Sequence, residues 1–329
     1  HQRAASDFAL WCFVAVLNTL ILTRSVYHLV LLPVALAFVW LVAAHRRRTL
    51  AICAVLCIVS LGWYAKNQAV FGFFGASSWS GMGLWRVASQ PYTHDELAAL
   101  RDEGLLDAMV VDIRAFSLPS AYEPFGYDKR SPVAVLANED RNNVNIPAIS
   151  ACYGRTAVPL ALHRPLRHVR AVGEAYACYC RPASRYKHLR GNAARIPGHE
   201  AFYADVLQGA SVMSRPSRDL GTYLFFLLPA ACALYPLQIL ARGRRDGRPP
   251  WCVLRDDPVL LWCFTMIVYT TAVACTMEQG ENDRFKFAVE LPLWIFIPVV
   301  LARIPWLRGG RQDDAPPGGT RSKDNGGAS

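Results

Sequence analysis

Six apolar segments separated by polar stretches constrain the fold of this chain more than any other feature. They occupy residues 7–23, 26–44, 50–65, 220–241, 258–276 and 287–302. A helix needs about 20 apolar residues to cross the hydrocarbon core of a bilayer, so each segment has nearly the length of a span. Several are short, and one of the first three could instead be a re-entrant or interfacial helix. We predict a mainly α, polytopic helical membrane protein with about six transmembrane helices.

The distribution of basic residues predicts how these segments are oriented. Cytoplasmic loops are the more basic ones, because Lys and Arg next to a span hinder translocation. The opposite short loops carry only Arg24, Arg284 and Lys286, whereas one set of segment ends carries fourteen cations: Arg3, Arg46, Arg47, Arg48, Arg242, Arg244, Arg245, Arg248, Arg255, Arg303, Arg308, Arg311, Arg321 and Lys323. We therefore expect both termini to be cytoplasmic. This bias accounts for most of the net charge of +10, and the sequence contains no nucleic-acid-binding motif.

The long region after the third segment falls outside the cytoplasm in this orientation. Residues 66–218 are too many for a linker, so we expect one α-rich extracytoplasmic domain inserted after the third span. The predicted organisation is then three transmembrane helices in residues 1–65, this domain, three transmembrane helices in residues 219–304, and a tail in residues 305–329. The tail is rich in Gly, Pro and Asp, and we expect it to be disordered and cytoplasmic.

Local signals predict two helices within the extracytoplasmic domain. Thr93 followed three residues later by Glu96 is a capping box, and Gly104 is a suitable end for that helix. We interpret residues 117–150, which contain several Pro and Asn residues, as an irregular loop.

The second helix is expected to begin at Pro165 and to end before Pro182. Its first turns are basic, and five residues share one face: Leu166, Val169, Val172, Gly173 and Tyr176. Two interpretations remain open, a basic amphipathic helix on lipid headgroups or an ordinary domain helix.

Most of the ten cysteines lie in or beside the apolar segments, where they act as small apolar residues. Cys152, Cys178 and Cys180 lie in the outer domain, so one disulfide from Cys152 to either partner is possible in an oxidising compartment. Their spacing is not that of a zinc site, and we predict no metal-ligating residues.

Small residues and aromatic residues alternate after the third segment, which suits an interfacial turn with close backbone approach. Lys66-Asn67, Phe71-Gly72 and the run Ser77-Ser78-Trp79-Ser80-Gly81 resemble the exit of a middle span in bacterial polytopic glycosyltransferases of the GT-C class, of the family-39-like, protein-mannosyltransferase-related type. Residues 165–186 and the run 281–285 before a final span are similar to the same group. The resemblance covers the C-terminal portion of such an enzyme.

This resemblance implies a transferase that takes a sugar from a polyprenyl-phosphate carrier and passes it to an extracytoplasmic glycan or protein acceptor. Such an enzyme must offset the charge of the lipid phosphate and activate an acceptor hydroxyl. The cations where spans meet the outer surface are the candidate phosphate ligands: Arg284, Arg24, Lys66 and Lys286. Arg284 is the first choice, because its planar guanidinium binds phosphate oxygens in pairs. Instead of binding phosphate, Arg284 could pair with Glu281 or Asp283 and stabilise the hairpin. Lys66 could simply extend its ammonium group from the end of the span to the membrane surface.

The catalytic base is harder to assign. Members of this class carry an acidic residue on the first outer loop, whereas the early outer loop seen here, residues 23–26, has none. Since the chain begins at His1 without a signal-peptide pattern, we expect the base upstream of His1 in an N-terminally truncated sequence. Glu281 and Asp283, with their neighbour Glu278, are weak candidates that could assist an acceptor or bind a divalent metal.

A non-catalytic polytopic protein whose outer domain binds a partner or a glycan is the alternative hypothesis, in which the outer cations only anchor the hairpins. A transporter is disfavoured, because the segments lack the intramembrane charged residues and paired broken helices that coupling sites require.

Overall fold

The computed structural model describes residues 7–23, 27–75, 77–127, 146–181, 191, 194–199, 201–202, 214–215, 218–219, 223–278 and 282–304. The regular structure of these residues is helical, apart from the two-residue strands β1 (Ser214–Arg215) and β2 (Arg218–Asp219), which pair antiparallel. The mainly α class is therefore confirmed. The tail in residues 305–329 lies outside the described residues.

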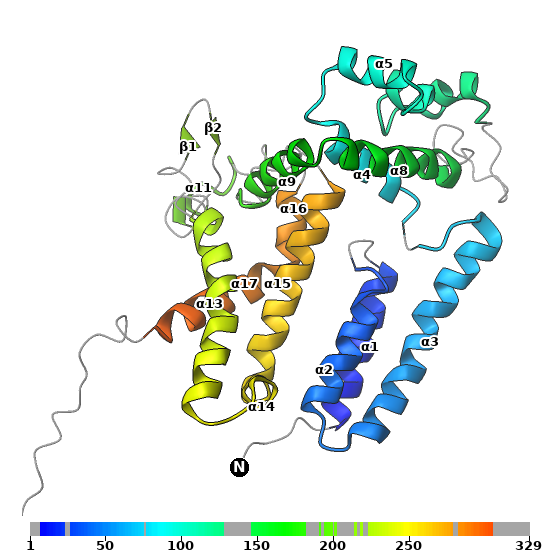
Figure 1. The fold of residues 1–329 in the computed structure, drawn as a ribbon. Helices are drawn as coiled ribbons and strands as arrows, with labels where there is room; N and C mark the ends of the chain where they lie inside the picture. The colour runs from blue at the N-terminus through cyan, green and yellow to red at the C-terminus, as the bar shows by residue number, and fades with distance from the viewer. Residues whose placement is uncertain are drawn as a thin grey trace, which may run out of the picture.

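A bundle of apolar helices makes up one part of the molecule (Figure 1). Three of its helices are long and apolar enough to cross a membrane: α3 (Arg46–Phe71), α13 (Leu224–Arg245) and α15 (Pro258–Met277). Three shorter apolar helices accompany them: α1 (Asp7–Thr23), α2 (Leu31–Val42) and α17 (Glu290–Ala302). Length and composition thus suggest a multi-pass membrane protein.

Aromatic side chains join the first three bundle helices to the last three. Trp262 of α15 lies edge-on to Phe13 of α1, with ring centroids 4.5 Å apart, and 5.3 Å from Phe38 of α2. Such edge and tilted pairs stabilise beyond their area alone. The two halves, separated by residues 66–218, therefore share one apolar core.

Helix α3 buries its polar side chains and exposes its apolar ones. Its buried residues are Thr49, Cys53, Cys57, Ser60, Tyr64 and Asn67. Its exposed residues include Val55, Ile58, Val59 and Leu61, each exposed by 46–63%. In water this pattern would cost free energy, whereas in lipid it is favourable, because small and polar residues pack between helices and apolar ones face the tails.

One end of the bundle holds the first turn of α3, the last turn of α13 and the loop from α13 to α15 (Figure 1). We call it the basic end, because Arg46, Arg47, Arg48, Arg242, Arg244, Arg245, Arg248 and Arg255 belong to these segments. The short helix α14 (Pro250–Leu254) connects α13 to α15 there. Asp256, which is largely buried, accepts from Arg242 and Arg248 at 2.9 Å each, and Asp257 pairs with Arg303 at 2.5 Å. The basic residues at this end therefore also form ion pairs, which connect α13, α15 and α17.

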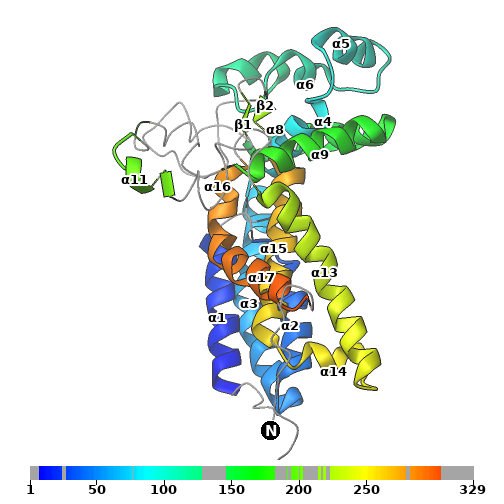
Figure 2. The ribbon, with the colours of Figure 1, turned by 90° about the vertical axis from the view of Figure 1, so that its left-hand side faces the viewer.

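A second part of the molecule, called the cap here, covers the opposite end of the bundle (Figures 1 and 2). It consists of α4 (Ser80–Ser89), α5 (His94–Asp102), α6 (Ala108–Asp112), the 3₁₀ helix η1 (Pro119–Phe125), α8 (Ile146–His163) and α9 (Pro165–Tyr179), with a core of its own. The short helix α11 (Pro197–His199) follows in the chain.

Helix α5 begins as the sequence predicts. The Thr93 hydroxyl accepts from the backbone N–H of Glu96, and the Glu96 carboxylate accepts from the backbone N–H of Thr93. The chain turns away at Gly104, which has a φ of 78°. A capping box depends on four neighbouring residues only, so it could be recognised without knowledge of the fold.

Two glycines of α4 allow its backbone to touch its neighbours. A Cβ atom on Gly81 would lie 1.8 Å from the Ser150 carbonyl oxygen of α8, and one on Gly83 would lie 2.2 Å from the Met277 carbonyl oxygen of α15. The predicted close approach after the third segment is thus observed. The same stretch, however, forms a helix from Ser80 onward instead of a turn throughout.

Two sequence expectations for the cap need correction. The irregular loop predicted for residues 117–150 contains η1 and the first turn of α8. All ten cysteines are free thiols, so Cys152 forms no disulfide with either candidate partner.

The apolar face predicted on α9, whose surroundings the sequence left open, differs from the face that packs against the rest of the protein. Leu166 and Val169 are exposed by 85% and 66%, and the buried residues are Ala171, Ala175, Cys178 and Tyr179. The small alanines allow α9 to pack closely against α15, whereas a count of large apolar residues selects the other side of the helix.

Candidate functional site

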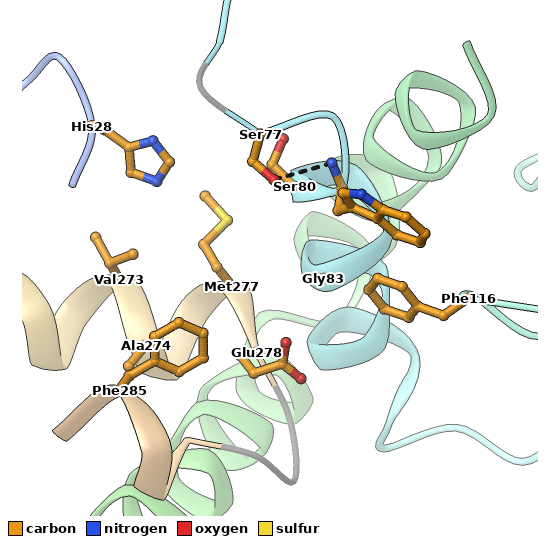
Figure 3. Close-up of a pocket in the computed structure, with 11 residues that line it drawn as sticks. His28, Ser77, Ser80, Gly83, Phe116, Val273, Ala274, Met277, Glu278 and Phe285 are labelled. Atoms are coloured by element: carbon orange, nitrogen blue, oxygen red, sulfur yellow. Dashed lines mark hydrogen bonds between the residues drawn. The ribbon is translucent and has the colours of Figure 1, made fainter. Parts of the chain in front are cut away.

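A cavity of about 380 Å³ lies where the bundle meets the cap. Its lining comes from the loop before α2, the start of α4, the end of α15 and the short helix α16 (Asp283–Lys286). The lining residues are His28, Ser77, Trp79, Ser80, Gly83, Phe116, Val273, Ala274, Met277, Glu278 and Phe285 (Figure 3). The apolar end of α15 and the polar start of α4 thus face each other across one space.

Glu278 supplies a carboxylate to this cavity (Figure 3). The residue is only 7% exposed, and its Oε1 accepts from Nη1 of Arg86 at 2.7 Å. A buried carboxylate with a charged hydrogen-bond partner is held in one position. Glu278 therefore presents a fixed acceptor at the border between the apolar and polar halves of the cavity.

Aromatic rings line the cap side of the same cavity. Trp79 and Phe116 stack with centroids 5.4 Å apart and planes 10° apart. The guanidinium of Arg86 lies 5.5 Å from the centroid of Phe116, within the range of a cation–π contact. Trp79, Phe116, Arg86 and Glu278 therefore form a continuous chain of contacts, which we call the aromatic–acidic wall.

His28 contributes a ring on the bundle side (Figure 3). Its backbone N–H donates to the Tyr269 hydroxyl at 2.8 Å, which fixes the loop before α2 against α15. Burial lowers the pKa of His28 below its usual range, because desolvation disfavours the imidazolium ion. The imidazole is therefore neutral at physiological pH and able to accept a proton or a hydrogen bond.

Two buried polar side chains fix the chain around α16. The Asn282 amide donates to the carbonyl oxygens of Ala274 and Glu278, both at 2.7 Å, and so closes the C-terminal turn of α15. Nζ of Lys286 is completely buried and donates to the Arg181 carbonyl oxygen at 2.5 Å, just beyond α9. The segment that follows Glu278 is thus attached to both α15 and the end of α9.

A second cavity of about 300 Å³ adjoins the first across the start of α4. Ser77, Ser80 and Met277 line both cavities, and Phe73, Phe74 and Arg155 line only the second. The second cavity therefore leads from the aromatic–acidic wall toward the C-terminal end of α3 and the basic side chain of Arg155.

Two of the predicted site residues, Arg284 and Asp283, lie in α16, directly before the cavity-lining Phe285. Their side chains are outside the described parts of the structure. Arg24 and Glu281 lie outside the described residues altogether.

Lys66 lies near the C-terminal end of α3, with Nζ 3.7 Å from the centroid of Trp63 and 5.7 Å from that of Phe71. Neither Lys66 nor the buried Lys286 is among the described residues that line the first cavity. No group of three or more potential metal ligands occurs in the described parts of the chain.

Sequence reasoning missed two members of the site. Arg86 and Glu278 are 192 positions apart, so no local pattern indicates their ion pair. His28 is a single histidine between two apolar segments, and no sequence pattern links it to α4 or α15. The one usable signal for Arg86 is its place as a lone cation three residues after Gly83, in the stretch predicted to allow close backbone approach.

Comparison of this chain with protein-family models, with curated proteins and with solved structures finds no match. The functional argument therefore rests on the site and on the motif resemblance.

Proposed function

We propose that this protein is an integral-membrane glycosyltransferase that moves a sugar from a polyprenyl-phosphate carrier to an extracytoplasmic acceptor. In this proposal all six apolar helices lie in the membrane, the cap formed by residues 66–218 lies outside the cytoplasm, and both termini lie inside. The ion-paired basic end supports this orientation, because basic loops remain in the cytoplasm.

The first cavity is the observation that carries the proposal. An isoprenoid-linked sugar has an apolar tail, a charged phosphate and a polar ring, so its site must join lipid to an aqueous domain. The cavity meets that need, with Val273, Ala274 and Met277 on the bundle side and the aromatic–acidic wall on the cap side. Convergent polar groups in a largely apolar pocket are typical of ligand sites.

The described side chains have distinct roles in the proposed reaction. Trp79 and Phe116 stack against the sugar, and Glu278, positioned by Arg86, accepts the proton of the acceptor hydroxyl. The hydroxyl oxygen then bonds to the anomeric carbon while the bond from that carbon to the phosphate oxygen breaks. Polyprenyl phosphate leaves with the electron pair of that bond.

The phosphate ligands remain those that the motif resemblance implies. Arg284, which precedes the cavity-lining Phe285, and Arg24, four positions before His28 in the sequence, are the proposed ligands that offset the leaving charge. The inverting reaction needs no metal in this scheme, and a divalent cation remains compatible with the carboxylates of residues 278–283.

Transfer by the full-length protein in proteoliposomes tests the proposal. Polyprenyl phosphates carrying radiolabelled mannose, glucose or arabinose serve as donors, and a cell-envelope extract supplies acceptors. We expect sugar-dependent release of polyprenyl phosphate, reduced about 100-fold or more by Glu278→Gln, which removes the proton acceptor. The matched control Glu103→Gln, at an exposed position of the cap, should retain wild-type activity. If the wild-type protein releases no carrier from any donor, the proposal is wrong.

Glycan binding without transfer is the second candidate, and the exposed Trp79–Phe116 stack favours it. In that case the Arg86–Glu278 pair serves only to hold α4 to α15. The two candidates differ in one result: a binder retains glycan affinity in Glu278→Gln and releases no carrier in any form.

A further inference from the structure

The α8–α9 corner exposes an apolar surface that no described part of the protein covers. Val158 and Leu162 of α8 are exposed by 50% and 73%, and Leu166 and Val169 of α9 by 85% and 66%. We call these four residues the corner stripe. Such exposure in a water-facing domain is unfavourable unless another apolar phase covers it.

The other faces of α9 have partners. One face is buried against the bundle through Ala171, Ala175 and Cys178. A second face meets the rest of the cap: Arg167 donates to Glu96 of α5 at 2.8 Å, and Glu174 accepts from Gln90 at 2.6 Å. The corner stripe lies on the remaining side of α9, turned away from both the bundle core and α5.

The stripe is continuous with the apolar exterior of the bundle. Tyr176, one turn beyond Gly173 on the same side of α9, donates to the carbonyl oxygens of Leu224 and Phe225 at the start of α13. Its ring lies 5.4 Å from that of Phe225, and the next residue, Phe226, is 56% exposed. The apolar surface therefore passes from α9 directly onto the exposed side of a helix long enough to span the membrane.

Helix α8 presents its exposed apolar side next to the bundle. Arg155 and Ala151, which share that side with Val158 and Leu162 at helical spacing, line the second cavity together with Phe73 and Phe74, just after α3. The part of the stripe on α8 is therefore on the side of that helix that meets the second cavity. Figure 2 shows α9 lying crosswise over the start of α13.

From this geometry we infer that the α8–α9 corner is a membrane-surface anchor, with the corner stripe inserted into the outer leaflet beside α13. Arg170, whose side chain is 80% exposed, and Arg164, which is 49% exposed, flank the stripe. Arginines beside a short apolar surface are typical of helices that lie at the headgroup level, where they attract anionic lipid. The inference rests on the membrane location and is independent of the transfer reaction.

The experiment uses the full-length protein in nanodiscs that contain anionic lipid. An environment-sensitive fluorescent amino acid replaces Leu166 in one variant and Asp102 in another; Asp102 lies in α5, with a side chain 70% exposed. Both positions are exposed, so neither replacement disturbs a packed core. Emission is titrated with iodide, which quenches from water, and with lipids that carry a nitroxide near the headgroup.

We expect the probe at residue 166 to lose most of its emission to nitroxide lipid and little to iodide, with a blue-shifted maximum. The probe at residue 102 should show the opposite pattern. Iodide quenching at residue 166 equal to that at residue 102 would mean that the stripe faces water, and protection from both quenchers would mean that protein covers it. Either result overturns the inference.

Discussion

Helix α3 of the bundle and helices α5 and α6 of the cap have opposite distributions of polar and apolar residues. In α3, Cys57 and Ser60 are buried while Val55 and Ile58 are exposed. In the cap, Leu100, Met109 and Val110 are buried while Asp95 and Glu103 are exposed. The difference indicates that one chain folds against two solvents, and that the cavity lies at the boundary between them.

The close packing of α4 against α8 inside the cap, which the bundle helices do not share, gives the largest expected effect. Gly81→Ala places a Cβ 1.8 Å from the Ser150 carbonyl oxygen, and neither backbone can move without separating α4 from α8. We expect a loss of at least about 3 kcal/mol, at the upper end of overpacking effects, measured as a fall in the melting temperature in detergent. Gly173→Ala, where a Cβ meets nothing within 4 Å, should instead gain about 0.5–1 kcal/mol. Equal effects would mean that α4 and α8 are not in close contact.

Placing a charge on the exposed surface of the bundle, and another on that of the cap, tests whether lipid surrounds the first and water the second. Ile58 in α3 and Leu118 in the cap are exposed by 62% and 66%, so the same change to Asp is a matched pair. Ile58→Asp should cost about 2.5–3.5 kcal/mol, because residue 58 lies at the centre of a spanning helix, and Leu118→Asp should stay within about 0.5 kcal/mol. Insertion yield and melting temperature in nanodiscs measure the cost of each substitution. Similar costs at the two positions would contradict the assignment of two solvents.

A polar pair inside the bundle offers a finer test. Ser60 Oγ donates to Asn18 Oδ1 at 2.6 Å between α3 and α1. A double-mutant cycle with Asn18→Ala and Ser60→Ala should give a coupling of about 0.6 kcal/mol, and at most about 1.7 kcal/mol. The solvent-exposed pair Arg101–Asp112 of the cap provides the comparison, since salt should weaken it and leave the bundle pair unchanged.

The pH dependence of His28 is the smallest predicted effect. Burial lowers its pKa in the folded state, so the unfolded chain binds this proton first, near pH 6.5. The free energy of unfolding should therefore fall as pH drops below about 6.5, and level off once pH passes the folded-state pKa. His28→Asn should flatten this part of the melting-temperature profile between pH 8 and 5. An unchanged slope would mean that His28 is hydrated.

Local features of the fold could be predicted from the sequence, because neighbouring residues determine them. The capping box of Thr93 and Glu96 and the start of α9 at Pro165 are confirmed. The packing face of α9 could not be predicted, because its contacts use small residues such as Ala171 and Ala175, which carry little weight in an amphipathic pattern. Burial by close backbone approach depends on the partner helix, which the sequence of α9 does not contain.

The candidate site was predictable only in its location. The charged stretch after α15 drew attention to residues 278–286, and Glu278 does line the cavity. Its partner Arg86 comes from α4, 192 positions earlier in the chain, and Lys286, expected at the surface, is buried and donates to the Arg181 carbonyl oxygen. A pattern of charges places residues near a membrane surface, whereas pairing across distant segments follows from the tertiary fold.

Photo-crosslinking from the cavity tests the central claim most directly, namely that the space beside Glu278 holds a polyprenyl phosphate. A photoreactive amino acid replaces Met277 in the full-length protein, with Trp251 of α14, at the basic end, as the control position. The account predicts that radiolabelled polyprenyl phosphate marks position 277 far more than position 251, and that farnesyl phosphate, but not farnesol, competes. Equal labelling at both positions, or equal competition by the uncharged alcohol, would contradict it.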